Sequence, residues 1–136
     1  MLAMLRWVIS GKLAGAHRPR AANKMLQQVP KRAVDTWVRV AKRRFRIKSI
    51  MCLLHHRELR RYENLSGGLL AYYRANGFEV KHIPSKNYQK PSLSKRKLRK
   101  VWKAYKKLPK PVLIHCSAGI SRTGAAVRYI KRRENR

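Results

Sequence analysis

Acidic residues are scarce in this chain. Its 136 residues include five Asp and Glu against 35 Lys and Arg, which gives a formal net charge of +30. A field this positive attracts polyanions, so we expect salt-sensitive, non-specific association with nucleic acid or another polyanion. The charge does not by itself identify the biological partner.

Long apolar runs and metal-ligand spacings are absent as well. Residues 1–9 are apolar but short, and Arg6 interrupts them, so they do not make a secretory signal. No run is long enough to cross a membrane. His55, His56 and His82 lack the spacing of a zinc site. We therefore expect one domain with a single modest core, no membrane partner, no metal and no other cofactor.

One short run carries most of the chemistry. Residues 115–124 read His-Cys-Ser-Ala-Gly-Ile-Ser-Arg-Thr-Gly, between an apolar stretch at 111–114 and a helix-like stretch at 123–133. Five residues separate Cys116 from Arg122. A loop that curls from a strand into a helix N-terminus points successive backbone N–H groups inward, and these donors bind a phosphate. The sequence therefore predicts a phosphate-binding loop.

Cys116 and Arg122 are the predicted catalytic residues of this loop. The field that binds a phosphate also stabilises a thiolate, so Cys116 is expected to act as a nucleophile near neutral pH. The planar guanidinium of Arg122 can hold two phosphate oxygens at once. His115 is expected to support the loop by hydrogen-bonding its backbone. The expected substrate-binding residues are Ser117, Ala118, Gly119, Ile120, Ser121 and Thr123.

The chain contains one other cysteine, Cys52, which lies in an apolar run and is expected to be a buried core thiol. A nucleophilic Cys116 must stay reduced to work. Two cysteines of this kind suit a reducing cytoplasm, and we expect that location.

The apolar pattern predicts strands that alternate with helices. Strands are expected over 47–54, 78–83 and 111–114, and helices over 30–44, 66–76, about 93–105 and 123–133. Ser66, and either Ser92 or Ser94, are expected to cap helices, and Gly77 to end one. This alternation predicts an α/β fold with a mostly parallel sheet of four to five strands, covered on both faces.

The run from His115 to Gly124 resembles the active-site signature of the cysteine-dependent protein tyrosine phosphatase superfamily, closest to its small dual-specificity-like members. Residues 7–15 resemble the opening hairpin of these enzymes, with Arg18-Pro19 after it. The resemblance implies a phosphotyrosine-phosphatase-like fold and one phosphatase-like domain over 1–136. It also implies a hydrolase that forms a cysteinyl-phosphate intermediate on a phosphorylated protein, with tyrosine or dual specificity.

The chain departs from this superfamily at the general acid. Members carry an upstream aspartate that protonates the leaving oxygen, often within Pro-x-x-Asp-x-x-x-Pro. Residues 84–91 match that stretch but place Asn87 there, and the only aspartate, Asp35, lies in an expected helix. General acid catalysis is worth about 10²–10⁴-fold, so we expect slow turnover on poor leaving groups and less loss on phenolic or anhydride ones. Glu58 or Glu63 is an alternative acid.

The resemblance also differs at the end of the chain. Relatives carry further helices after the one that follows the loop, whereas this chain stops at Arg136, about three helical turns after the loop. We therefore expect a domain truncated after that helix, in which Val127, Tyr129 and Ile130 have fewer packing partners.

Two other functions stay open. Some members of the superfamily remove the 5′ γ-phosphate from RNA, and they tend to lack the aspartate because their leaving group is a diphosphate. Asn87 and the positive charge fit that reading, but Ser117, Ala118 and Ser121 look like the protein phosphatase version of the loop. The second alternative is a non-catalytic pseudophosphatase that binds phosphate or nucleic acid. Retention of both the cysteine and the arginine argues against it.

Overall fold

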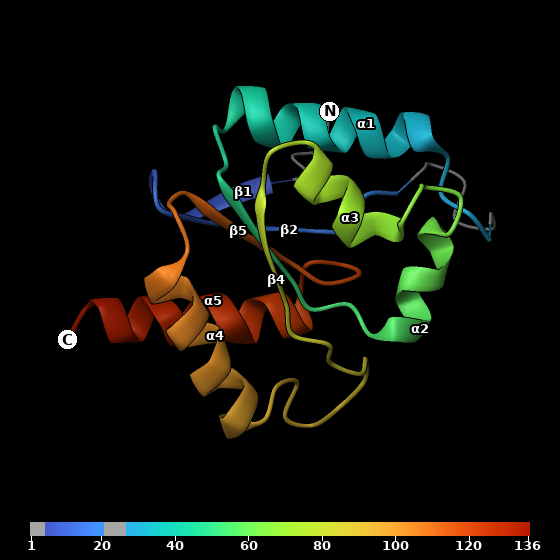
Figure 1. Cartoon of the computed structure of the whole chain (residues 1–136). Coiled ribbons are helices and arrows are strands. Elements are labelled where there is room, and N and C mark those ends of the chain that lie inside the picture. The colour runs from blue at the N-terminus through green and yellow to red at the C-terminus, as the bar shows by residue number, and fades with distance from the viewer. Residues whose placement is uncertain (1–4, 21–26) are drawn as a thin grey trace.

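The computed structural model describes residues 5–20 and 27–136, so part of the apolar N-terminal segment, residues 1–4, lies outside the described residues. Five strands form one sheet in the order β1-β2-β5-β3-β4 (Figure 1). The strands are β1 (Leu5–Ile9), β2 (Leu13–Ala16), β3 (Ser49–Cys52), β4 (Glu79–His82) and β5 (Val112–His115). The β1–β2 hairpin is antiparallel, and the other three pairings are parallel. The predicted α/β fold with a mostly parallel sheet is confirmed.

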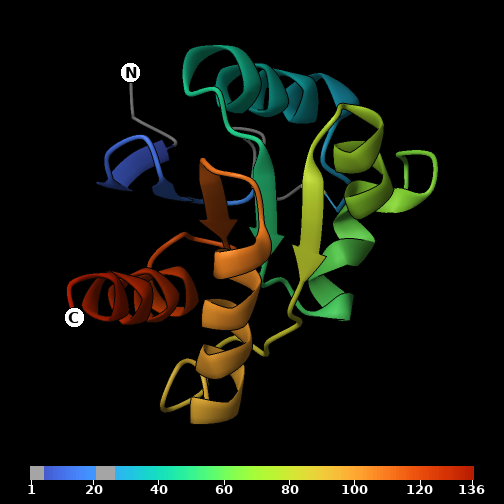
Figure 2. The ribbon, with the colours of Figure 1, turned by 60° about the vertical axis from the view of Figure 1, so that its left-hand side comes forward.

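Helices cover both faces of this sheet. They are α1 (Lys31–Arg39) with a π-helical continuation η1 (Val40–Arg44), α2 (His56–Leu59), the 3-10 turn η2 (Arg60–Tyr62), α3 (Gly68–Ala75), α4 (Lys95–Lys107) and α5 (Ser121–Glu134). Figures 1 and 2 show α1 and α3 on one face and α4 and α5 on the other. None of the helices within the described ranges is both long and apolar enough to span a membrane.

Successive strand residues divide between two hydrophobic clusters because their side chains point to opposite faces. In β3, Ile50 packs in the cluster that contains α1 and α3 side chains, and Met51 in the cluster that contains α4 and α5 side chains. Leu113 and Ile114 of β5 divide in the same way. Both strands are buried at every position, as expected for central parallel strands covered on both faces.

The helix boundaries test the predicted caps. Ser94 caps α4, since its Oγ accepts the Lys97 N–H at 3.2 Å. Gly77 follows α3 with φ +94°, as predicted for a residue that ends a helix. The cap predicted at Ser66 is wrong: Gly67 and Gly68 adopt φ +76° and +84°, so α3 begins at Gly68 without a side-chain cap.

The helix after the loop packs more completely than its position near the chain end suggested. Val127 and Ile130 are 5% and 0% exposed, because α4 and the sheet cover them. Both side chains therefore have packing partners within this chain, and α5 packs against α4 and the sheet. Cys52 is a fully buried core thiol, as predicted, and burial raises its pKa to about 12.

Candidate active site

The carboxyl ends of three parallel strands meet at one edge of the sheet. β3 leads to α2, which carries Glu58; β4 leads to residues 84–91, which carry Asn87; and β5 leads to the loop over 116–120. Ligand sites of open α/β sheets lie at this edge. The topology thus brings together segments that are far apart in the sequence.

The loop between β5 and α5 is held against the end of β2. Gly119 has φ +75°, and a Cβ atom there would lie 2.6 Å from the backbone of Ala16, so only glycine fits. Arg6 donates to the Gly119 carbonyl at 2.8 Å, and the Arg18 N–H donates to the Ser117 carbonyl at 3.0 Å. These contacts fix the curl of the loop.

The curled loop presents free backbone donors. Within the described ranges, the N–H groups of residues 117–120 find no hydrogen-bond acceptor. They lead into the N-terminus of α5, a 14-residue helix whose N-cap, Ile120, makes no side-chain cap bond. Unpaired N–H groups and the positive end of a helix dipole together form an anion site. The strand, loop and helix follow one another as the spacing of the run predicted.

Arg122 lies at the far end of the loop, buried and firmly oriented. It is 1% exposed, and its Nη1 and Nη2 donate to Glu58 Oε1 and Oε2 at 2.7 and 2.9 Å. Nη1 also donates to the Ser85 carbonyl at 2.7 Å. Its Nε is buried and has no partner among the described residues. A buried N–H group without an acceptor costs folding free energy. An acceptor such as a phosphate oxygen would satisfy the Nε–H group of Arg122.

Glu58 is committed to Arg122 rather than to proton transfer. Its Oε1 also accepts the His55 N–H at 2.8 Å, while His55 accepts the Arg57 N–H in a capping box that starts α2. Burial opposes ionisation of this carboxyl, but hydrogen bonds from Arg122 and the His55 N–H outweigh it and lower the pKa of Glu58. Glu58 is therefore an anion that orients Arg122 and is poorly suited to replace a general acid.

His115 supports the loop from the core. Its Nε2 pairs with the Tyr73 hydroxyl at 2.9 Å and its Nδ1 with the Cys116 carbonyl at 3.2 Å, and its ring packs edge-on against Trp37. Burial lowers the pKa of His115 to about 4, so the ring is neutral at physiological pH. Nδ1 then donates to the carbonyl and Nε2 accepts from the hydroxyl. The residue sets the loop backbone and is itself 0% exposed.

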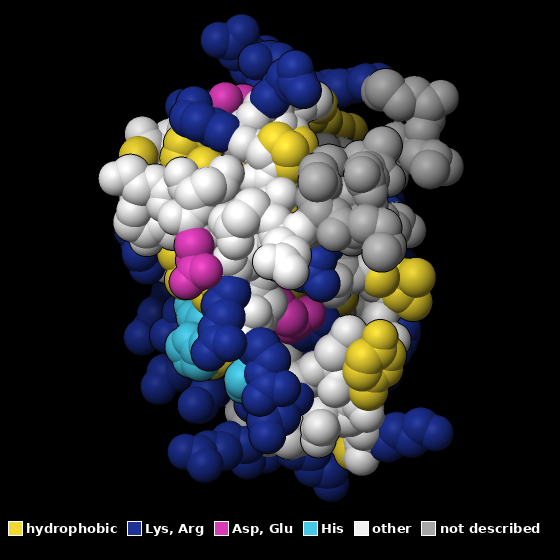
Figure 3. Space-filling view, turned by 90° about the vertical axis from the view of Figure 1, so that its right-hand side faces the viewer, with side chains coloured by type: hydrophobic (Ala, Val, Ile, Leu, Met, Phe, Trp, Pro, Cys, Tyr) yellow, Lys and Arg dark blue, Asp and Glu magenta, His cyan; other side chains and the backbone are white. Residues whose placement is uncertain are grey.

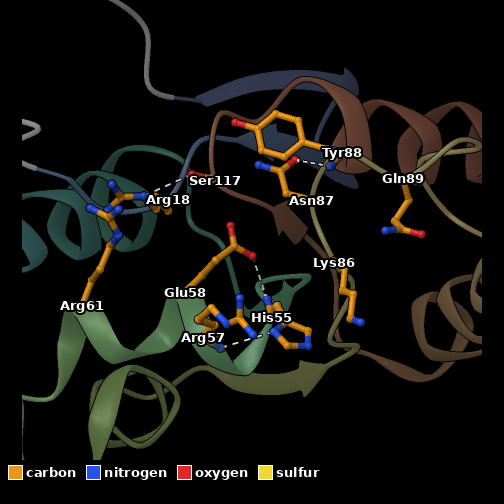
Figure 4. A pocket seen from close by; sticks show the side chains of 10 residues that line it. All are labelled: Arg18, His55, Arg57, Glu58, Arg61, Lys86, Asn87, Tyr88, Gln89 and Ser117. Carbon is orange, nitrogen blue, oxygen red and sulfur yellow. Dashed lines mark hydrogen bonds between the residues drawn. The ribbon is translucent and has the colours of Figure 1, made fainter.

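A pocket of about 490 Å³ opens beside the loop (Figure 4). It is lined by Arg18, His55, Arg57, Glu58, Arg61, Lys86, Asn87, Tyr88, Gln89 and Ser117. Cys116 is 2% exposed, and the residue after it, Ser117, lines the pocket. Arg122 is hydrogen-bonded to Glu58, which also lines the pocket. Asn87 lines the pocket, so the position predicted for the acid reaches the site, but it carries an amide.

The structure also separates some residues from the site. Asp35 lies on α1, where its carboxylate accepts hydrogen bonds from Lys31 and the Tyr72 hydroxyl. Glu63 does not line the pocket. The side chain of Ile120 is 70% exposed, so Ile120 can contribute to the site only through its backbone N–H group. The Thr123 hydroxyl is fully buried and has no partner in the described part of the chain.

Four basic residues of the pocket were not identified from the sequence: Arg18, Arg57, Arg61 and Lys86. Arg18 is 8% exposed and donates from Nε to Ser117 Oγ at 3.3 Å and from Nη1 to the Tyr62 hydroxyl at 3.0 Å. In the sequence, Arg18 was noted only because Arg18-Pro19 follows the predicted hairpin. The other three had none, because basic residues occur throughout the chain.

This sheet, with its loop between a buried cysteine and a buried arginine, defines a member of the cysteine-dependent protein tyrosine phosphatase superfamily of the dual-specificity-like kind. The chain belongs to the family described as "Polymorphic toxin system, DSP-PTPase phosphatase", whose model matches residues 31–133. It therefore contains a phosphatase domain of this type.

Solved structures share the fold at low sequence identity. The core catalytic domain of the PP-IP phosphatase SIW14 from S. cerevisiae, in complex with citrate, is 20% identical with a TM-score of 0.67, over 98% of this chain and 68% of that one. A mutant form of Tk-PTP is 20% identical with a TM-score of 0.64, over 97% of this chain and 73% of that one. Tk-PTP in its active form is 18% identical with a TM-score of 0.60, over 97% and 85%. No curated protein matches the chain.

Proposed function

We propose that this protein hydrolyses phosphate esters through a cysteinyl-phosphate intermediate on Cys116. The sulfur attacks phosphorus, the S–P bond forms as the P–O bond breaks, and the leaving group departs with the electron pair. Water then attacks the phosphocysteine, which releases orthophosphate and restores the thiolate. The observation that carries this proposal is the set of unpaired donors between Cys116 and Arg122: the loop N–H groups and the buried Arg122 Nε.

The loop and Arg122 stabilise the transferring phosphoryl group. Its three equatorial oxygens gain charge in the transition state and meet the backbone donors and the guanidinium. Glu58 holds that guanidinium by two bonds, so the donors are oriented before substrate arrives. The buried surroundings keep the interactions strong, since water does not screen them.

Asn87 decides which leaving groups the enzyme accepts. The pocket contains one carboxylate, Glu58, and it is paired with Arg122, so no lining carboxyl group is free to protonate an alkoxide. Leaving groups of low basicity need no proton. Two substrate classes fit: phosphotyrosine in a protein, which the loop residues Ser117–Ser121 favour, and phosphoanhydrides such as an RNA 5′-triphosphate, which the basic pocket favours. The reaction needs a reduced Cys116, which supports a reducing cytoplasm as its place of action.

The test is to trap the intermediate. During turnover of p-nitrophenyl phosphate, rapid acid quenching followed by peptide mass spectrometry should find phosphate on the Cys116 peptide. The intermediate should accumulate, because Asn87 is also unable to activate the water that breaks it down. The peptide that contains Cys52 is the internal control and should carry none. Release of p-nitrophenol with both peptides unmodified would refute the proposed mechanism.

Asn87→Asp is expected to raise turnover. A carboxyl at this position of the pocket can protonate the leaving oxygen, so kcat/KM on a phosphoserine peptide should rise by about 10²-fold or less. The gain in kcat/KM on p-nitrophenyl phosphate should be smaller, because kcat/KM reports formation of the phosphocysteine and p-nitrophenol leaves unaided. The measurement is kcat/KM against pH for both substrates, with Gln89→Asp, also in the pocket lining, as the matched control. An equal gain from both variants would mean that added negative charge, rather than an acid at position 87, raises the rate.

A further inference from the structure

The pocket wall beyond the phosphate loop is strongly cationic. Arg18, Arg57, Arg61 and Lys86 line it, against the single carboxylate of Glu58 (Figure 4). They come from three segments: the stretch after β2, the α2–η2 region and the loop after β4. Like charges that converge from separate segments repel one another unless an anion lies between them. The arrangement therefore indicates a second anion site next to the first.

Three of the four cationic side chains of this wall are free to bind. Arg57, Arg61 and Lys86 are exposed, and their side chains make no hydrogen bond or ion pair with any other described residue. Arg18 is different, because it is buried and bonded to Ser117 and Tyr62. Glu58 does not neutralise the wall, since both of its oxygens face Arg122. Figure 3 shows how few acidic side chains accompany the basic ones on this face of the molecule.

The size and lining of the pocket describe its ligand. A volume of about 490 Å³ exceeds what one orthophosphate fills, and it lies in the range of small-ligand sites. The lining holds no aliphatic side chain, and its only large aromatic, Tyr88, is 95% exposed. A phenol ring would find no aliphatic side chain to pack against there. Charged oxygens would find four cationic partners.

Resting on the proposed function, we propose that Arg57, Arg61 and Lys86, with Arg18, form a second phosphate subsite, and that the preferred substrate is a phosphoanhydride. Cys116 attacks the terminal phosphorus, and the bond to the bridging oxygen breaks. The electron pair stays on the shortened phosphate chain, which leaves as an anion without a proton. The subsite holds that chain, so the step that forms the phosphocysteine needs no acid at position 87. Water then releases orthophosphate from the cysteine.

The experiment compares substrates on a variant that removes the subsite. The triple variant Arg57→Gln, Arg61→Gln, Lys86→Gln should lower kcat/KM for inorganic tripolyphosphate by about 10- to 100-fold, and for p-nitrophenyl phosphate by less than about threefold. The wild-type protein should have a higher kcat/KM for tripolyphosphate than for p-nitrophenyl phosphate. Parallel assays with a nucleoside 5′-triphosphate and a 5′-triphosphate RNA show which molecule carries the anhydride.

The control removes the same charge elsewhere. The control is the triple variant Lys100→Gln, Lys103→Gln, Lys107→Gln, whose positions lie on α4 and line a different groove. It should keep the wild-type kcat/KM for both tripolyphosphate and p-nitrophenyl phosphate. Calorimetric titration of Cys116→Ser with tripolyphosphate, with and without the subsite changes, measures binding independently of turnover.

An equal loss of kcat/KM in both triple variants, or an equal loss on both substrates, would overturn the subsite. Absence of p-nitrophenyl phosphate hydrolysis in wild type would instead overturn the proposed function, while the titration still tests the subsite. Wild-type preference for a phosphotyrosine peptide over every anhydride would also overturn the inference.

Discussion

Cys116→Ser is expected to lower kcat on p-nitrophenyl phosphate by about 10⁴-fold or more. A serine hydroxyl does not ionise near neutral pH, so the loop donors would surround a group that cannot attack phosphorus. The change is nearly isosteric, and we expect the thermal unfolding midpoint to stay within a few degrees. Steady-state kinetics and thermal unfolding on the same samples check both statements.

The chain provides its own control for this substitution. Cys52 is 0% exposed and belongs to the core cluster beneath α1 and α3. Cys52→Ala should therefore reduce the free energy of unfolding by about 1–2 kcal/mol and leave kcat within about threefold. The two variants should thus separate activity from stability. If Cys116→Ser retained a tenth of the wild-type rate, Cys116 would not be the nucleophile.

Gly119→Ala should have the largest effect on the fold of the loop. Its φ of +75° costs an L-residue about 1–2 kcal/mol, and the added Cβ would also lie 2.6 Å from the Ala16 carbonyl carbon and oxygen. Those atoms belong to β2, between two strand neighbours, and cannot move aside. We expect a loss of about 3 kcal/mol or more in the free energy of unfolding. We also expect a fall in kcat of about 10²-fold, because the loop N–H groups are displaced. Chemical denaturation and steady-state kinetics measure these effects.

Gly11→Ala separates the two causes. Gly11 has nearly the same φ, +72°, but no atom lies within 4 Å of the added Cβ, and it sits in the β1–β2 turn. It should cost only about 1–2 kcal/mol and leave kcat unchanged. Equal losses of stability in the two variants would show that the backbone conformation alone, and not the contact with Ala16, makes glycine necessary at position 119.

Local patterns accounted for most of the fold. Two apolar runs and one alternating segment predicted the three parallel strands β3, β4 and β5, and Gly77 and Ser94 acted as the predicted helix signals. The failure at Ser66 has a local cause, since two glycines with positive φ follow it and delay the helix. The burial of Val127 and Ile130 could not be predicted from their own segment, because it depends on α4, which packs against α5.

The amino-acid order alone determined the loop, because its parts are neighbours in the chain. Cys116, Gly119 and Arg122 lie within one loop between a strand and a helix, so their spacing already predicted the form of that loop. Tertiary structure alone decided what surrounds that loop. Glu58 lies 64 positions from Arg122, and the basic pocket wall comes from three separate segments. Ion pairs and pockets between distant segments form only where the sheet order brings strand ends together, and nothing in the local sequence encodes that order.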